Sequence, residues 1–133
     1  MSPTDSRRRD SFAHATTILI LSADAVGAAL LGALIETLGY SVKFGRPPES
    51  TDATIRRVRP NVCLLDCDDP ASCNDEVLGR AAMRGISVVI FGTSQALARV
   101  RALAEEHEIE MLLVPPTISE LDATLQRAVL KAG

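Results

Sequence analysis

The sequence feature that most constrains the fold is the segment Asn61–Pro70, which reads NVCLLDCDDP. Four apolar residues follow one another without interruption and lead into Asp66, a cysteine, two more aspartates and a proline. An unbroken apolar run of this length predicts a strand that is buried on both faces, as in a parallel sheet. Because ligands bind outside the carboxyl ends of the strands in open α/β sheets, Asp66 is the first candidate for a functional residue.

The remaining chain alternates short apolar runs with segments of helical spacing. Further strands are predicted at Thr17–Leu21, Ser41–Phe44, Ile86–Phe91 and Glu110–Val114. A helix is predicted after each strand, and this alternation implies right-handed crossovers and a parallel sheet covered on both faces. Since Lys43 lies in the short second strand, that strand is expected at a sheet edge. The predicted fold is therefore α/β, a doubly wound, flavodoxin-like (βα)5 domain with strand order 2-1-3-4-5.

Capping residues predict where four of the five helices begin. The candidates are Asp24 for the first helix, Asn74 or Asp75 for the third, Ser94 for the fourth, and Thr117 with Glu120 as a capping box for the fifth. The second helix is predicted at about Ser50–Val58. The first helix also carries apolar residues at three- and four-residue steps, namely Leu30, Leu31, Leu34, Ile35 and Leu38. We expect these to form one buried stripe.

Length and composition predict one globular domain. The chain has 133 residues, of which 47% are hydrophobic, and this is long enough to bury a core. Residues 1–15 are polar and include Arg7–Arg9, so they are predicted to be a disordered tail before a domain at 16–133. The formal net charge of -3 argues against a nucleic-acid surface.

The segment Thr17–Ile35 is apolar and follows three arginines, so it imitates a signal peptide or a membrane span. Asp24 opposes that interpretation, since a charge in mid-span costs about 2.5 to 3.5 kcal/mol on insertion scales. The pattern also changes at Ser22 from that of a strand to that of a helix. We therefore expect a cytoplasmic protein that does not enter the membrane.

The three cysteines, Cys63, Cys67 and Cys73, lack the paired C-x2-C spacing of a zinc site, and no histidine lies near them. Cys63 falls inside the predicted central strand and is expected to be buried. Cys67 and Cys73 flank a short loop and could meet, but without an export signal free thiols are the favoured prediction.

Taken together, several motifs resemble the receiver domain of response regulators, the phosphoacceptor module of two-component signalling. The resemblance covers Thr17 to Val129. It rests on ILIL followed by an aspartate, on LGYSV after the first helix, on RPNVCLLD with a proline four residues on, and on the pair Pro115–Pro116 with Leu121. In such domains an acidic pair after strand one holds Mg²⁺ and the strand-three aspartate takes the phosphoryl group. A serine or threonine ends strand four, and a lysine precedes the proline after strand five.

Only part of that chemistry transfers to this sequence. Asp66 matches the acceptor position. Ser22 and Ala23 stand where the acidic pair is expected, with Asp24 one position too late, and Pro115 stands at the lysine position. For the strand-four hydroxyl, Gly92 fits by distance from the strand start and Thr93 by distance to Pro115, and we retain Thr93 as the candidate.

The missing groups predict weak or absent Mg²⁺-dependent phosphorylation, because phosphoryl transfer requires that charge on the transferred group be neutralised. Asp24, Asp66 and Asp68 could still supply a weak Mg²⁺ site, since Mg²⁺ prefers oxygen ligands. The alternative is that Asp68 and Asp69 only solvate the loop. The resemblance also predicts a cis peptide bond at Pro115–Pro116.

Two functional hypotheses follow. In the first, the chain is a stand-alone pseudo-receiver and not an enzyme, which binds a histidine kinase or another signalling protein, or dimerises through the fourth helix, fifth strand and fifth helix. That surface carries Arg99, Arg101, Glu105, Glu106, Glu120, Asp122 and Arg127. In the second, a histidine kinase phosphorylates Asp66. A flavin or nucleotide binder is disfavoured, because no glycine-rich loop follows strand one and only 3% of residues are aromatic.

Overall fold

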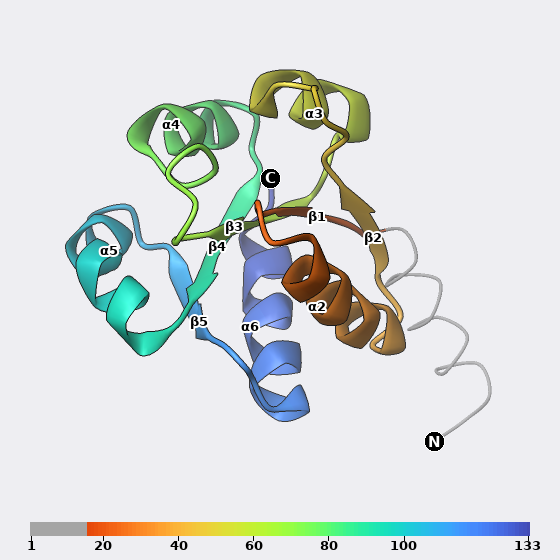
Figure 1. The fold of residues 1–133 in the computed structure, drawn as a ribbon, viewed down its shortest axis with the longest axis vertical. Coiled ribbons are helices and arrows are strands. Elements are labelled where there is room, and N and C mark those ends of the chain that lie inside the picture. Colours follow the sequence, from red (N-terminus) through yellow and green to blue (C-terminus); the bar gives the residue numbers. More distant parts are fainter. Residues whose placement is uncertain (1–15) are drawn as a thin grey trace.

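Five parallel strands form one sheet in the computed structural model, which describes residues 16–133 (Figure 1). The strands are β1 (Thr17–Leu21), β2 (Ser41–Phe44), β3 (Val62–Asp66), β4 (Ser87–Gly92) and β5 (Glu110–Leu113). Their order is β2-β1-β3-β4-β5, so the predicted flavodoxin-like fold class and strand order are confirmed. The predicted tail at 1–15 lies outside the described residues.

Two layers of helices cover the sheet. They are α2 (Ala25–Thr37), α3 (Thr51–Val58), α4 (Asp75–Met83), α5 (Ser94–Glu106) and α6 (Ile118–Lys131). Ile18 and Ile20 of β1 pack with α2 and α6, whereas Leu19 and Leu21 pack with α3 and α4, as the alternation of side chains along a strand requires. Within residues 16–133, no helix has both the length and the apolar content that crossing a membrane demands.

The helix starts follow the predicted capping chemistry with one exception. Asp24, Asn74 and Thr117 each accept a hydrogen bond from a backbone N–H three residues on, and Glu120 completes the capping box. Ser50, for which no capping role was predicted, caps α3 in the same way. The predicted Ser94 cap of α5 is wrong, because Thr93 has this role and Ser94 is the first helical residue. Threonine and serine both cap well, so the sequence did not separate the two.

Three strand boundaries differ from the prediction by one residue, and one of them is the end of β4, which lies at Gly92 and not at Phe91. Strand β4 begins at Ser87, because the Ile86 N–H bonds to Ala81 O of the preceding helix while the Ser87 N–H bonds to Asn61 O beside β3. Strand β5 ends at Leu113 and not at Val114.

The predicted cis bond at Pro115–Pro116 is also misplaced, since the cis bonds of residues 16–133 are Pro47–Pro48 and Val114–Pro115. Val114–Pro115 and Pro115–Pro116 are both X–Pro bonds, and such bonds have only a weak intrinsic preference for trans. The sequence alone therefore did not show which of the two is cis.

The predicted buried stripe of α2 is only partly correct. Leu31 and Ile35 are buried, with Ala28 and Gly32 beside them, and Leu38 is partly buried. Leu30 and Leu34 instead face solvent. A helix buries little more than one side against a sheet, and α2 contains more leucines than that side accommodates.

Candidate functional site

Asp66 ends β3 at the centre of the sheet, where the residues that follow β1, β4 and β5 meet it. A cavity of about 450 Å³ lies at this edge, and its walls include Ser22, Asp66, Gly92 and Val114. Asp66 is partly buried there. The position agrees with the rule that ligands of doubly wound sheets bind beyond the carboxyl ends of the central strands.

Two neutral donors hold the Asp66 carboxylate. The Ser22 hydroxyl donates to Asp66 Oδ2 at 2.7 Å, and the backbone N–H of Asp68 donates to Oδ1 at 2.9 Å. Ser22 Oγ in turn accepts the Asp24 N–H at 3.0 Å. At the position where the receiver resemblance expects a metal-binding acid, this chain therefore presents a hydroxyl that bonds directly to the acceptor.

The other two candidate metal ligands line the same cavity but have different partners. Asp24 Oδ1 accepts the Gly27 N–H at 3.0 Å and caps α2. Asp68 Oδ1 lies 3.3 Å from the Arg99 guanidinium. Over residues 16–133, no group of three histidine, cysteine or acidic side chains is arranged to hold a metal ion. Because Mg²⁺ needs near-octahedral oxygen ligands, these residues do not form a built magnesium centre.

Gly92, the other position considered for the strand-four hydroxyl, has no side chain, and Cys67 fills the space beside it. Gly92 is the last residue of β4 and is buried. A Cβ atom at residue 92 would collide with Cys67 Sγ, so the thiol occupies the space that such a side chain would need. Thr93 is exposed at the cavity wall, where its Oγ1 accepts the Ala96 N–H at 3.3 Å. Its hydroxyl oxygen is therefore engaged in capping α5.

The lysine position of the resemblance carries no charge. Leu113 pairs with Gly92, and the next residue, Val114, donates its N–H to Gly92 O at 3.0 Å. Val114 is thus the first residue beyond β5, and not Pro115 as the spacing suggested. Val114, Pro115 and Pro116 all line the cavity, so this wall is apolar whichever residue stands in for lysine.

Arg99 is a site residue that sequence reasoning did not bring to the site. We predicted it on an interaction surface, which the structure does not test, and its guanidinium also reaches Asp68, which lies 31 residues earlier in the chain. No local pattern links the two residues. The strand order could have suggested the contact, since β3 and β4 are neighbours and the segments that follow them leave the same edge of the sheet.

The three thiols are not joined by a disulfide, and the pKa of each is raised. Burial raises the pKa of Cys63 to about 12. Burial, followed by the charge of Asp68, raises the pKa of Cys67 to about 11, and burial raises that of Cys73 as well. A thiol reacts as its thiolate, so these shifts suppress reactivity beside Asp66.

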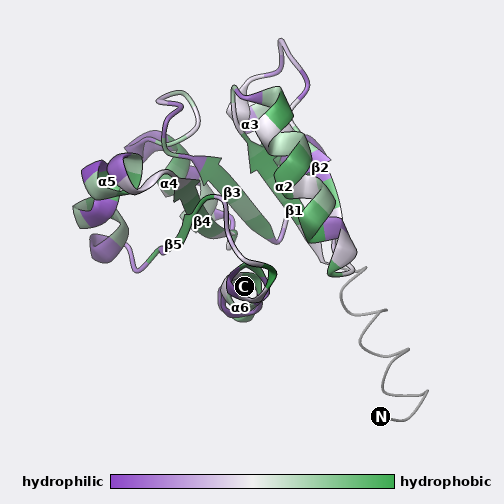
Figure 2. Ribbon diagram, turned by 60° about the horizontal axis from the view of Figure 1, so that its bottom comes forward, coloured by the Kyte–Doolittle hydropathy of each residue, from purple (hydrophilic) through white to green (hydrophobic). Residues whose placement is uncertain are grey.

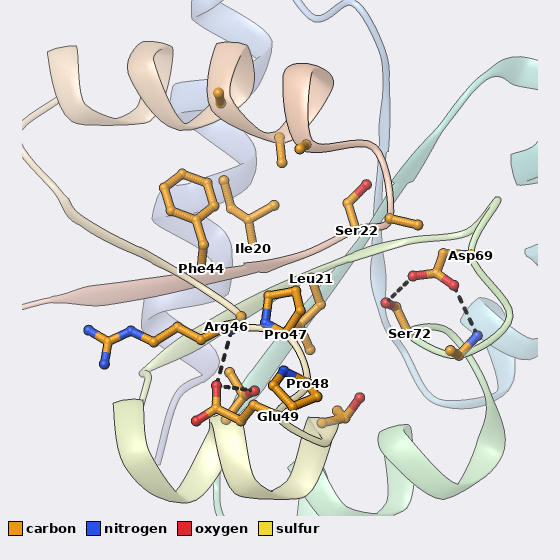
Figure 3. Close-up of a pocket in the computed structure, with 18 residues that line it drawn as sticks. Ile20, Leu21, Ser22, Phe44, Arg46, Pro47, Pro48, Glu49, Asp69 and Ser72 are labelled. Carbon is orange, nitrogen blue, oxygen red and sulfur yellow. Dashed lines mark hydrogen bonds between the residues drawn. The ribbon is translucent and has the colours of Figure 1, made fainter.

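A second cavity of about 560 Å³ lies on the β2 side of the same edge (Figure 3). Ile20, Leu21, Phe44 and two prolines give it apolar walls. Its carboxylates are already engaged, because Asp69 accepts the Ser72 hydroxyl at 2.6 Å and Glu49 pairs with Arg57 at 2.7 Å. The Arg57 guanidinium and the Thr54 hydroxyl lower the pKa of Glu49 to about 2.

Comparisons with known proteins place the fold. No protein-family model and no curated protein matches the chain. Among solved structures, the N-terminal domain of the nisin resistance regulator, a lantibiotic response regulator, is 17% identical with a TM-score of 0.72 over 86% of this chain and 97% of that one. The signal receiver domain of a response regulator from Bacteroides fragilis is 21% identical with a TM-score of 0.70, covering 86% and 96% of the two chains. The receiver domain of a sensor histidine kinase from Pseudomonas aeruginosa, which has a magnesium ion coordinated in its active-site cleft, is 23% identical with a TM-score of 0.66, covering 86% and 97%.

These similarities define the class of fold. Residues 16–133 adopt the flavodoxin-like fold of response-regulator receiver domains, and the match extends over nearly the whole of each neighbour. At identities of 16 to 23% the likeness concerns architecture, and function has to be argued from the site.

Proposed function

We propose that the chain is a receiver-like signalling module of a two-component or phosphorelay system that acts by binding other proteins, with weak or absent Mg²⁺-dependent phosphorylation of Asp66. In this proposal the chain is not an enzyme. The observation that carries it is the hydrogen bond from the Ser22 hydroxyl to Asp66 Oδ2 at 2.7 Å. The Ser22 hydroxyl is a neutral donor. It satisfies the Asp66 carboxylate but adds no negatively charged ligand for a divalent ion.

The electrostatics of the cavity support this proposal. Phosphoryl transfer gains most of its acceleration from positive groups that neutralise charge on the equatorial oxygens. Around Asp66, β4 ends at a glycine, Val114 and Pro115 carry no charge, and Ser22 and Ala23 stand where the acidic pair is expected. Asp66 thus retains its position in the fold while the groups that would activate it are missing.

The second candidate function is that of a working phosphoacceptor, phosphorylated on Asp66 by a histidine kinase. One observation favours it, namely the Arg99 guanidinium that pairs with Asp68 at 3.3 Å at the cavity wall. Arg99 is exposed, and it could turn from Asp68 toward a phosphoryl group because guanidinium groups bind phosphate well.

The partners in this proposal are a histidine kinase or another signalling protein, or a second copy bound through α5, β5 and α6. Part of the charge on that surface is compensated within the chain. Arg127 and Lys131 both pair with Glu110, at 3.0 and 3.5 Å. Arg101, Glu105 and Glu106 are exposed on α5, and they are the charges that a partner of complementary pattern would meet.

The test is incubation of the full chain with Mg²⁺ and acetyl phosphate, followed by intact-mass spectrometry. We expect the unmodified mass for the natural sequence and for Ser22→Ala, which removes the hydroxyl without adding a ligand. The double variant Ser22→Asp, Val114→Lys restores an acid and an ammonium, so we expect it to gain an adduct of about 80 Da. Adding Asp66→Asn to that variant should abolish the adduct. A stoichiometric adduct on Asp66 in the natural sequence would contradict the proposal and support the phosphoacceptor alternative.

A further inference from the structure

The solvent-facing side of α2 is apolar from Ala25 to Leu34, and polar residues occur only in the last turn. No charged residue occurs between Asp24 and Glu36. The side chains of Val26, Leu30 and Leu34 are 72%, 66% and 39% exposed. Figure 2 shows α2 mostly green and white, whereas α5 is largely purple. On a surface helix this side is normally polar, so the composition of α2 is not explained by packing against the sheet.

The exposed residues of α2 form two parallel rows along the helix. We call them together the α2 face: the large row is Val26, Leu30 and Leu34, and the small row is Ala25, Ala29 and Ala33. Each row repeats every four residues, which is the spacing of the ridges that pack into grooves between helices. A ridge of large side chains thus lies directly beside a groove of small ones on the same helix.

We propose that the α2 face binds the α2 face of a second copy of this chain. Two-fold symmetry brings the same surface of both copies together, so such an interface must be complementary to itself. The α2 face meets this condition in shape, because the ridge of each copy enters the groove of the other. It also meets it in charge, because the net charge of -3 lies elsewhere on the chain and no like charges oppose each other across the face.

The size of the face indicates a weak and reversible dimer. A patch of this kind covers on the order of a few hundred Å², whereas stable interfaces bury about 800 Å² on each partner. The patch continues into the cavity wall, since Leu30, Leu34 and Pro116 line the cavity that contains Asp66. A dimer formed on the α2 face therefore also restricts access to Asp66. This inference does not depend on whether Asp66 is phosphorylated.

The test is sedimentation velocity of the full chain from about 1 to 300 µM, which brackets a dimer dissociation constant on the order of 10 to 100 µM. Leu30→Glu places a charge in the ridge and should weaken dimerisation at least about tenfold, since a buried unpaired charge is costly. The matched control is Leu130→Glu, the same change at a side chain that is 85% exposed on α6. It should leave the dissociation constant within about twofold, as expected of a site outside the interface.

The variant Ala29→Leu separates a specific dimer from general stickiness. It makes the surface more apolar but fills the groove, so ridge-into-groove packing predicts weaker association and non-specific adhesion predicts stronger association. Circular dichroism should confirm that every variant is folded. The proposal fails if the natural sequence stays monomeric over the whole range, which would leave the α2 face for a different protein, or if Ala29→Leu strengthens association, or if Leu130→Glu weakens it as much as Leu30→Glu.

Discussion

Helices α2 and α5 are equal in length and similar in role, yet their outer surfaces differ completely. Each has 13 residues, follows a buried strand, and begins after an N-cap residue, which is Asp24 in α2 and Thr93 in α5. Each also buries a narrow stripe against the sheet, through Leu31 and Ile35 in α2 and Leu97 and Ala104 in α5. Away from the sheet, α5 carries exposed arginines and glutamates, whereas α2 carries only apolar residues along its central turns.

This difference separates what the fold requires from what it leaves free. Burial of one stripe per helix is enough to cover the sheet, and both helices provide it. Folding therefore does not require the outer face of α2 to be apolar, because a charged outer face such as that of α5 is compatible with the same fold. An apolar face that folding does not require is best explained by binding, and the comparison can be tested by substitutions on each side of each helix.

The largest effect should come from the buried stripe of α2. Ile35 is 0% exposed in the main core cluster. Ile35→Ala should lower the free energy of unfolding by about 2 to 5 kcal/mol, because it removes buried methyl groups and leaves a cavity. Urea denaturation at a concentration where the chain is monomeric measures the change.

The matched control for this prediction is Leu30→Ala. This variant shortens a side chain of four carbons to one carbon on the opposite face of the same helix. Leu30 is 66% exposed, so its truncation should change the free energy of unfolding by less than about 0.5 kcal/mol. Comparable losses for the two variants would mean that the outer face does support the fold, and the contrast with α5 would then lose its meaning.

An intermediate effect should come from the caps, where the two helices are alike. Asp24→Ala and Thr93→Ala each remove the acceptor for a backbone N–H, from Gly27 or Ala96, and each should cost about 1 kcal/mol of unfolding free energy. The conservative variants Asp24→Asn and Thr93→Ser should retain most of that stability. Thermal or urea unfolding compares the four proteins, and an effect confined to one helix would show that the two starts are not equivalent.

Much of the fold was predictable because it depends on local patterns. Short, mostly apolar runs located all five strands, and Lys43 in the second run correctly indicated a sheet edge. Boundary errors of one residue arose at Ile86 and Ser94, because hydrogen bonding sets these boundaries and the residue types do not reveal it.

The candidate site was less predictable because its contacts join distant segments. Asp66 was identified from its strand, but its bond from Ser22 spans 44 residues and the ion pair between Asp68 and Arg99 spans 31. The collision that a side chain at residue 92 would have with Cys67 depends on atomic positions and leaves no trace in the pattern. The exposure of Leu30 was missed for a different reason, since periodicity identifies apolar rows but not the number of rows that a sheet covers.

The smallest effect should come from the charged face of α5. Arg99 and Asp68 are 62% and 49% exposed, and ion pairs at this level of exposure contribute at most about 1 kcal/mol. A double-mutant cycle of Arg99→Ala and Asp68→Ala, followed by urea denaturation, should give a coupling energy below that limit, and 0.5 M salt should reduce it further because exposed charges are screened. A weak coupling would leave the α5 face free to rearrange around a partner, in keeping with its role in the proposed function. A coupling well above 1 kcal/mol would instead show that α5 is fixed to the loop after β3, so that its charges stabilise the Asp66 cavity and are not available for binding.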